Sequence, residues 1–297
     1  MAAIRFRTDF EPHYRDCIQV EPGIRRVVAE NPSTFTAWGT GTYILGTGRV
    51  AIIDPGPALD SHIQAVLAAV EGETVTHLLI THTHSDHSPA AAAIRERTGA
   101  PTYGFGPHPT AADTGGEERG DVDFVPDVVV ADGEVLHGQD FRVECVHTPG
   151  HISNHLCFAD RSRGVMFTGD HVMGWSTSVI PPPDGRVADY LQSLRRLLDR
   201  DDRRYLPTHG PVIDDPRPYV ESLIAHRVDR ERQILGHLSR GPASIAELVA
   251  VMYADVRPEL HEPAGRSVQA HLVALIEQGL VGDVGDVGDG RFLLVDP

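Results

Sequence analysis

The sequence contains no lysine, so all 26 of its basic residues are arginines. No lysine is therefore available to hold a substrate, form a Schiff base or act as a general base. Cysteine is scarce as well, because the chain has only Cys17, Cys145 and Cys157, at irregular spacing. Cysteines so few and so spaced exclude a disulfide framework and a thiolate metal site.

Long apolar runs and positive charge are also lacking. No stretch approaches the ~18 apolar residues that a membrane-spanning helix needs, and the first ten residues lack the pattern of a signal peptide. We therefore expect a cytoplasmic protein with no membrane contact. The formal net charge is −16, and this repulsion disfavours nucleic acid as a partner, although a local basic patch could override it.

The chain of 297 residues is long enough for two domains, or for one large domain with an appendage. Alternating strand and helix patterns predict an α/β catalytic domain over 1–215, followed by a linking helix over 216–240 and a small domain over 241–297. In the first domain we expect strands over 43–46, 50–54 and 75–80, a helix over 59–70, and a helix that ends at Gly99 and has Ser88 as its N-cap.

The densest polar cluster is Thr-His-Thr-His-Ser-Asp-His-Ser at residues 81–88, directly after the apolar run 78–80. A solvated loop is the alternative interpretation, because the chain has 17 histidines and a few will be adjacent by chance. Two imidazoles two positions apart at a strand end leave no apolar anchor between them, so they are poor core side chains. Together with a carboxylate they make a good divalent-metal site.

Further ligand types recur downstream, each after a strand-like run. His151 follows 143–147, Asp170 follows 164–167, and His209 follows 204–206. Spacing then sorts all the donors into two sites and a bridge: His82, His84 and His151; Asp86, His87 and His209; and Asp170, whose two oxygens can bridge.

Two metals ~3.5 to 4 Å apart hold a bridging water as hydroxide near neutral pH and polarise the bond to be broken, so the predicted reaction is hydrolysis. Histidine and carboxylate ligands favour zinc, with manganese or iron as alternatives. Asp86 is expected to be catalytic, because it both binds the second metal and accepts the proton released as the hydroxide attacks. Two irregular segments, 104–120 and 180–185, are expected to border the site, the first as a mobile loop.

Several residues near the ligands have open roles. Asp54, at the end of its own strand, is expected to orient a ligand imidazole, and a simple turn residue before Pro55 is the alternative. His155 and His171 are interpreted as partners of the ligands or as substrate contacts. The other histidines, His108 among them, are expected in ordinary surface or core positions.

The C-terminal part is predicted to form helices over 219–238, 245–253 and 267–278 and short strands over 280–281 and 292–295. Helix, helix, hairpin is the pattern of a winged helix.

The hairpin of this winged helix is acidic. It carries Asp283, Asp286 and Asp289, opposed only by Arg291, so it would repel a DNA backbone. A calcium loop is disfavoured because the terminal glutamate of such loops is absent. We expect this domain to pack against the catalytic domain or against the second subunit of a homodimer.

The seven donors resemble the motif of the metallo-β-lactamase superfamily, His-x-His-x-Asp-His followed by a later His, a later Asp and a final His. The resemblance implies a four-layer αβ/βα sandwich with two bound metals. The chain is similar to the beta-lactamase-like protein 2 subgroup, which adds a C-terminal winged helix. Thr208, where related sequences usually have Gly, is expected to add bulk beside His209 and alter access to the pocket. The segments that carry the subgroup resemblance are 31–33, 41–43, 53–56, 148–151, 168–171, 209–212, 225–227 and 260–262.

Relatives in this subgroup include single-strand-selective endoribonucleases and thioesterases, and the wider superfamily adds lactonases. We therefore predict a binuclear metal-dependent hydrolase that uses a metal-bridging hydroxide on a small ester, thioester or lactone. An endoribonuclease with the same two-metal site is the alternative. A DNA-binding regulator ranks last, because Arg266 alone flanks the 267–278 helix.

Overall fold

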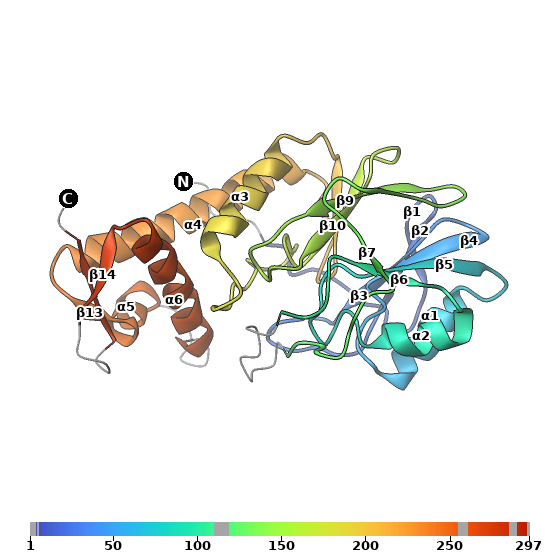
Figure 1. The fold of residues 1–297 in the computed structure, drawn as a ribbon, viewed down its shortest axis with the longest axis horizontal. Helices are drawn as coiled ribbons and strands as arrows, with labels where there is room; N and C mark the ends of the chain where they lie inside the picture. The colour runs from blue at the N-terminus through green and yellow to red at the C-terminus, as the bar shows by residue number, and fades with distance from the viewer. Residues whose placement is uncertain (1–3, 5, 110–118, 255–260, 285–289, 296–297) are drawn as a thin grey trace.

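The computed structural model describes residues 4, 6–109, 119–254, 261–284 and 290–295. Two β-sheets pack face to face, and helices cover the outer face of each (Figure 1). Separate apolar clusters fill the space between the sheets and the space under each helical layer. The predicted αβ/βα sandwich is therefore confirmed.

The first sheet has the strand order β1-β2-β3-β4-β5-β6-β7. Pairing is antiparallel from β1 to β4 and parallel from β4 onward. Helices α1 (Asp60–Ala69) and α2 (Ala90–Thr98) cover its outer face. The strands are β1 Ile18–Glu21, β2 Ile24–Val28, β3 Gly41–Leu45, β4 Arg49–Ile53, β5 Thr74–Leu79, β6 Thr102–Gly104 and β7 Val128–Val129.

The second sheet has the order β12-β11-β10-β9-β8. Only β11 and β12 pair in parallel, and the other neighbours are antiparallel. Helices α3 (Val187–Leu198) and α4 (Pro216–Leu238) cover this sheet. The strands are β8 Val135–His137, β9 Arg142–His147, β10 Leu156–Asp160, β11 Val165–Gly169 and β12 Arg204–Pro207.

The central strands β3, β10 and β11 are buried along their length because they have an apolar layer on both faces, which explains why they are predominantly apolar. Between the sheets, the rings of Tyr43 and Phe167 meet edge to face at 5.2 Å. Two backbone bonds join the sheets near the strand ends: Gly41 N donates to Thr208 O (2.8 Å), and Leu156 N donates to Thr81 O (2.7 Å). Loops from both sheets therefore meet at one edge of the sandwich.

Helix α2 begins one residue later than predicted. Its N-cap position is Pro89, and no side chain caps it. The hydroxyl of Ser88, predicted to be the cap, instead donates to Asp121 Oδ2 at 2.7 Å. The predicted C-terminal end is confirmed, because Gly99 adopts the left-handed conformation with φ 72°.

The C-terminal domain is a winged helix, as predicted. Helix α5 (Ile245–Met252) begins with a capping box between Ser244 and Glu247. Helix α6 (His261–Glu277) includes residues 261–266, which the sequence analysis placed outside the helix. The hairpin of β14 (Val281–Val284) and β15 (Arg291–Leu294) gains a third strand, β13 (Ala243–Ser244), beside β15.

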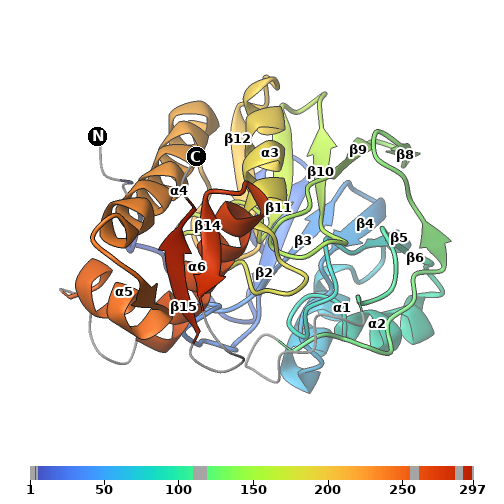
Figure 2. The same cartoon turned by 60° about the vertical axis from the view of Figure 1, so that its left-hand side comes forward.

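The winged helix packs against the αβ/βα sandwich through α6, which contacts α3 and α4 (Figure 2). Arg186 at the start of α3 pairs with Glu277 at 2.9 Å. In the wing, Arg291 pairs with Glu247 at 3.1 Å, and Asp286 and Asp289 lie outside the described residues. Across the described chain, none of the helices combines the length and apolar character needed to span a bilayer.

Candidate metal centre

All seven predicted donors lie at the edge where the two sheets meet. The 81–88 loop follows β5, and His151 follows β9, Asp170 follows β11 and His209 follows β12. Strands β9, β11 and β12 run in one direction, so their carboxyl ends share that edge. The fold thus gathers residues far apart in the sequence into one cluster, which is buried except for the partly exposed Asp86.

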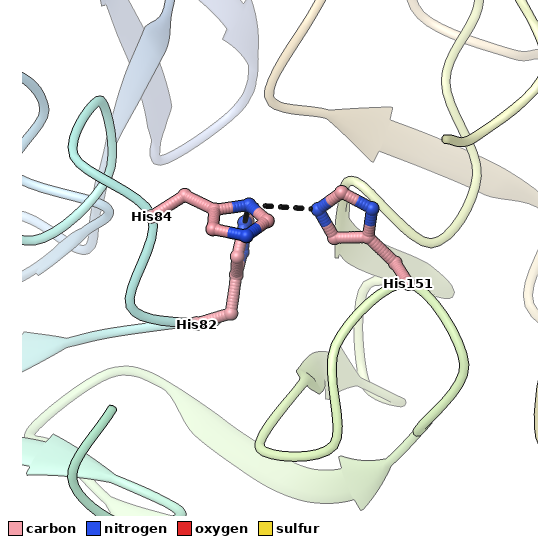
Figure 3. A group of neighbouring side chains, drawn as sticks. All are labelled: His82, His84 and His151. Atoms are coloured by element: carbon pink, nitrogen blue, oxygen red, sulfur yellow. Dashed lines mark hydrogen bonds between the residues drawn. The ribbon is translucent and has the colours of Figure 1, made fainter. Parts of the chain in front are cut away.

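The first group is made of three imidazoles. His84 Nδ1 lies 3.0 Å from His82 Nε2 and 2.9 Å from His151 Nε2 (Figure 3). Burial lowers the pKa of all three rings, so each is neutral near pH 7. A neutral imidazole has a single N–H group. In His151 this group is at Nδ1 and donates to Val179 O at 2.6 Å, so Nε2 has no proton to donate.

These three nitrogens fit a metal ion better than they fit one another. Tetrahedral ligands with metal–nitrogen bonds of about 2.0 to 2.1 Å lie roughly 3.3 Å apart, close to the spacing seen here. Neutral, buried imidazoles with converging lone pairs are also the form that a divalent metal requires. The first group could therefore hold a divalent metal.

The second group mixes imidazoles and carboxylates. Asp86 Oδ2 lies 3.2 Å from His209 Nε2 and 3.4 Å from His87 Nε2. Burial alone would lower the pKa of the two histidines, but Asp86 and Asp170 outweigh it and raise the pKa of His209 to about 10. The same carboxylates raise the pKa of His87 well above its usual value. In return, these imidazoles lower the pKa of both carboxylates despite their burial.

Asp170 lies between the two groups. Its Oδ1 is 3.3 Å from His209 Nε2 and 3.5 Å from His87 Nε2, whereas its Oδ2 is 3.9 Å from His151 Nε2. One oxygen thus faces each group. Three overlapping sets of neighbouring ligand atoms result: His82, His84 and His151; His82, His87 and Asp170; and Asp86, His87 and His209.

Asp54 supports the second group from behind. Its Oδ2 accepts bonds from His87 Nδ1 (2.9 Å), Thr81 Oγ1 (2.8 Å) and Thr208 Oγ1 (2.9 Å), and its Oδ1 accepts from Thr81 N (2.8 Å). The carboxylate fixes the proton of His87 on Nδ1 and turns Nε2 toward Asp170. This contact favours the predicted orienting role over a simple turn. Thr208 is 4% exposed and bonds Asp54 rather than adding bulk at the pocket.

His155 holds the backbone of Asp170. Its Nε2 accepts from Asp170 N at 3.2 Å, and its Nδ1 therefore donates to Thr148 Oγ1 at 2.9 Å. The close approach requires glycine before Asp170, because a Cβ at Gly169 would lie 2.6 Å from His155 Nε2. His171 is also buried, but it packs edge on against Tyr190 at 4.9 Å rather than facing the donors.

Several contacts around the donors had no sequence signal. Thr40 Oγ1 donates to Asp86 Oδ2 at 2.9 Å, and Gly39 O accepts from His209 Nδ1 at 3.1 Å. Backbone carbonyls such as that of Gly39 are present in every residue, so only the fold reveals which one is used. His108, expected in an ordinary position, reaches the loop through Thr83 Oγ1 at 2.8 Å.

The two irregular segments both approach the centre. Within 104–120, residues 110–118 lie outside the described structure, but Gly120 forms a β-bridge with His84. Beside 180–185, Val179 O accepts the bond from His151 described above, and Asp184 Oδ2 accepts from Ser153 N at 2.6 Å.

Family comparisons agree with the fold. A model described as the metallo-beta-lactamase superfamily matches residues 38–209. A second, described as a beta-lactamase associated winged helix domain, matches residues 244–291. The matches cover both domains.

Individual relatives extend along most of the chain. The beta-lactamase-like protein 2 homolog of Drosophila melanogaster is 31% identical over 290 residues, which are 92% of this chain and 94% of that protein. An atrochrysone carboxyl ACP thioesterase of Cryptosporiopsis sp. (strain 8999) is 29% identical over 264 residues, which are 82% of this chain and 76% of that protein. Among solved structures, a beta-lactamase domain protein from Burkholderia ambifaria superposes with a TM-score of 0.81 at 22% identity, covering 97% of this chain and 96% of that one, and this likeness concerns the fold alone.

Proposed function

The chain belongs to the metallo-β-lactamase superfamily of metal-dependent hydrolases, and we propose that it is a binuclear hydrolase of a small ester, thioester or lactone. The observation that carries the proposal is the position of Asp170, whose two oxygens face different groups of donors. A single carboxylate between two ligand sets is suitably placed to contact both members of a metal pair.

We assign His82, His84 and His151 to the first metal and Asp86, His87 and His209 to the second, with Asp170 between them. If bound by these residues, two divalent metals would supply an activated water and would polarise the carbonyl under attack. Zinc suits the preponderance of imidazole, and manganese or iron remain alternatives.

The protein's own residues prepare the site for this chemistry. Burial keeps the first group neutral, and Asp54, Gly39 and Val179 fix the orientation of the imidazoles that they accept from. The Asp86 carboxyl is held by Thr40 and is partly exposed, at 22% of its side chain. We assign to the Asp86 carboxylate, beyond the oxygen that faces the second group, the acceptance of the proton released during attack.

The surroundings of His209 favour an apolar acyl group. Trp38 precedes Gly39, and Trp175 packs against Gly210, where a Cβ would lie 3.2 Å from the Trp175 side chain. The two partly exposed indoles meet edge on at 6.4 Å. The thioesterase named among the relatives supports a thioester, and the net charge of −16 disfavours RNA.

The proposal is tested on purified protein loaded separately with zinc, manganese and iron. Metal content is measured, and a panel of thioesters, lactones, esters and unstructured RNA is assayed. We expect two metal equivalents and hydrolysis of an acyl substrate that His82→Ala abolishes. His137→Ala, at an exposed histidine of β8, is the matched control and should be fully active. RNA cleavage without acyl hydrolysis, or activity that survives His82→Ala, would overturn the proposal.

A further inference from the structure

Arg227, in the middle of α4, is a buried cation without a carboxylate partner. Its side chain is 4% exposed. Among the residues that the structure describes it makes no ion pair; it lies over the Tyr190 ring, with the guanidinium carbon 5.3 Å from the ring centroid, and it donates to Ser178 O. Burying an unpaired charge is costly, so a position that retains one calls for an explanation beyond packing.

The acceptor of Arg227 is one residue from the support of a donor in the metal centre. Ser178 O receives the guanidinium, and the next carbonyl, Val179 O, receives Nδ1 of His151 at 2.6 Å. Because a carbonyl can only accept, this bond places the proton on Nδ1 and leaves the lone pair of Nε2 facing His84 Nδ1 at 2.9 Å. Arg227 therefore holds the peptide directly before the one whose carbonyl sets the tautomer and direction of His151.

Tyr190 packs against the loop that carries His151. Gly150, just before His151, has φ +142°, and a Cβ there would lie 2.4 Å from Tyr190 Cα. Tyr190 thus contacts this loop through its backbone and Cβ, while its ring, with no exposed surface, lies against Arg227. The guanidinium, the ring and the 178–179 peptide thus form one packed support for His151.

This support comes from the helix that joins the two domains. Val220 and Leu223 of α4 pack in the core under the second sheet, whereas Ile234 and Leu238 pack in the winged-helix core. Arg227 lies between these two anchored halves, on the long helix seen leading to the C-terminal domain (Figure 1).

We propose that Arg227 is a positioning residue for His151, through which the linking helix α4 sets the metal affinity of the first group of donors. The inference rests on the metal assignment of the proposed function but not on the identity of any substrate. A purely structural role for Arg227 would change the stability of the fold and leave metal affinity unaltered.

The test compares Arg227→Met with the full-length protein, because Met has a similar length and removes both charge and donor. Zinc affinity is measured by competition with a chromophoric chelator, and Co²⁺ absorption reports the ligand geometry. We expect one of two zinc equivalents to bind about 10- to 100-fold more weakly, the range typical for loss of an outer partner of a metal ligand. Arg227→Lys keeps a cation and a donor and should recover part of that affinity.

Arg230→Met is the matched control. Arg230 lies on the same helix, but it contacts the Tyr253 ring at 4.6 Å and Gln233, not the 178–179 peptide. The zinc affinity of Arg230→Met should equal that of the unmodified protein. Unchanged affinity for both zinc ions in Arg227→Met, or an equal loss in Arg230→Met, would overturn the inference.

Two further outcomes separate this inference from the proposed function. Two zinc ions in the unmodified protein without acyl hydrolysis would contradict the function and leave the role of Arg227 standing if Arg227→Met loses one of them. If Arg227→Met does not fold, Arg227→Lys decides: its shorter side chain should leave one zinc equivalent bound more weakly than in the unmodified protein, and unchanged affinity for both zinc ions would overturn the inference.

Discussion

Replacing Asp54 with Asn should damage both the stability of the fold and the second metal. The backbone at position 54 has φ 48°, a left-handed conformation that Asn also tolerates. The change therefore removes the charge and one acceptor atom without new backbone strain. If Oδ1 keeps its bond from Thr81 N, the new amide nitrogen takes the place of Oδ2, which now accepts from three donors.

The Thr81 and Thr208 donors can adapt to the new amide, but His87 can do so only by changing the position of its proton. The hydroxyls of Thr81 and Thr208 can rotate and accept from the amide. The amide nitrogen donates, so His87 must accept its hydrogen at an unprotonated Nδ1. The proton of His87 then lies on Nε2, the nitrogen that faces Asp170 and Asp86. A protonated Nε2 cannot bind a metal, so the second group loses one of its donors.

The magnitude follows from the bonds exchanged. Three bonds to a carboxylate, worth about 1.5 to 3 kcal/mol each, become neutral bonds of about 1 kcal/mol, so the free energy of unfolding should fall by about 1.5 to 6 kcal/mol. Urea unfolding in the presence of a chelator measures this loss in the metal-free protein. Zinc competition should show one equivalent bound about 10- to 100-fold more weakly.

Thr208→Val provides the control for this prediction. It removes one hydroxyl bond to the Asp54 carboxylate and leaves His87 bonded to it, so stability should fall by about 1.5 to 3 kcal/mol with zinc affinity unchanged. If Asp54→Asn keeps both zinc equivalents at the original affinity, the orienting role of Asp54 is refuted.

Three other predictions concern pH, substrate and the winged helix. The pKa values of His87 and His209 are raised, to about 10 for His209, so both rings are cationic at pH 7. A metal must therefore displace the proton on the nitrogen that binds it in each ring. Zinc affinity should then increase as pH rises from 6 toward 10, and calorimetry in buffers of different ionisation enthalpy should detect proton release; a pH-independent affinity would contradict this. Trp175→Ala should raise KM about tenfold for long-chain thioesters but not for acetyl thioesters, as expected for about 1.4 kcal/mol of lost apolar contact, and an equal effect on both would exclude an acyl contact. Ser244→Ala should cost about 1 kcal/mol in thermal unfolding through loss of the α5 capping box, with hydrolysis unchanged.

The donors could be predicted from the sequence because each lies directly after a strand, where topology brings the carboxyl ends to one edge. The supports of those donors are of two kinds. Asp54 directly follows strand β4, so it could be predicted in the same way. Val179 O and Gly39 O are backbone atoms in irregular segments, and no residue type distinguishes them in the sequence.

The errors in the sequence analysis also have physical causes. Ser88 is a residue type that often caps a helix, but its hydroxyl donates instead to the carboxylate of Asp121, which is distant in the sequence. The sequence predicts that Thr208 adds bulk beside His209, but its hydroxyl lies next to a buried carboxylate and donates to it. Helix α6 starts earlier because Pro263 lies in the first turn, where a missing N–H is tolerated.

The most direct test of the central claim is a crystal structure of the zinc-soaked protein with anomalous diffraction measured at the zinc edge. The account predicts two anomalous peaks about 3.5 to 4 Å apart, the first among His82, His84 and His151 and the second beside His209, with Asp170 contacting both. A single peak, or two peaks of which Asp170 contacts only one, would contradict it.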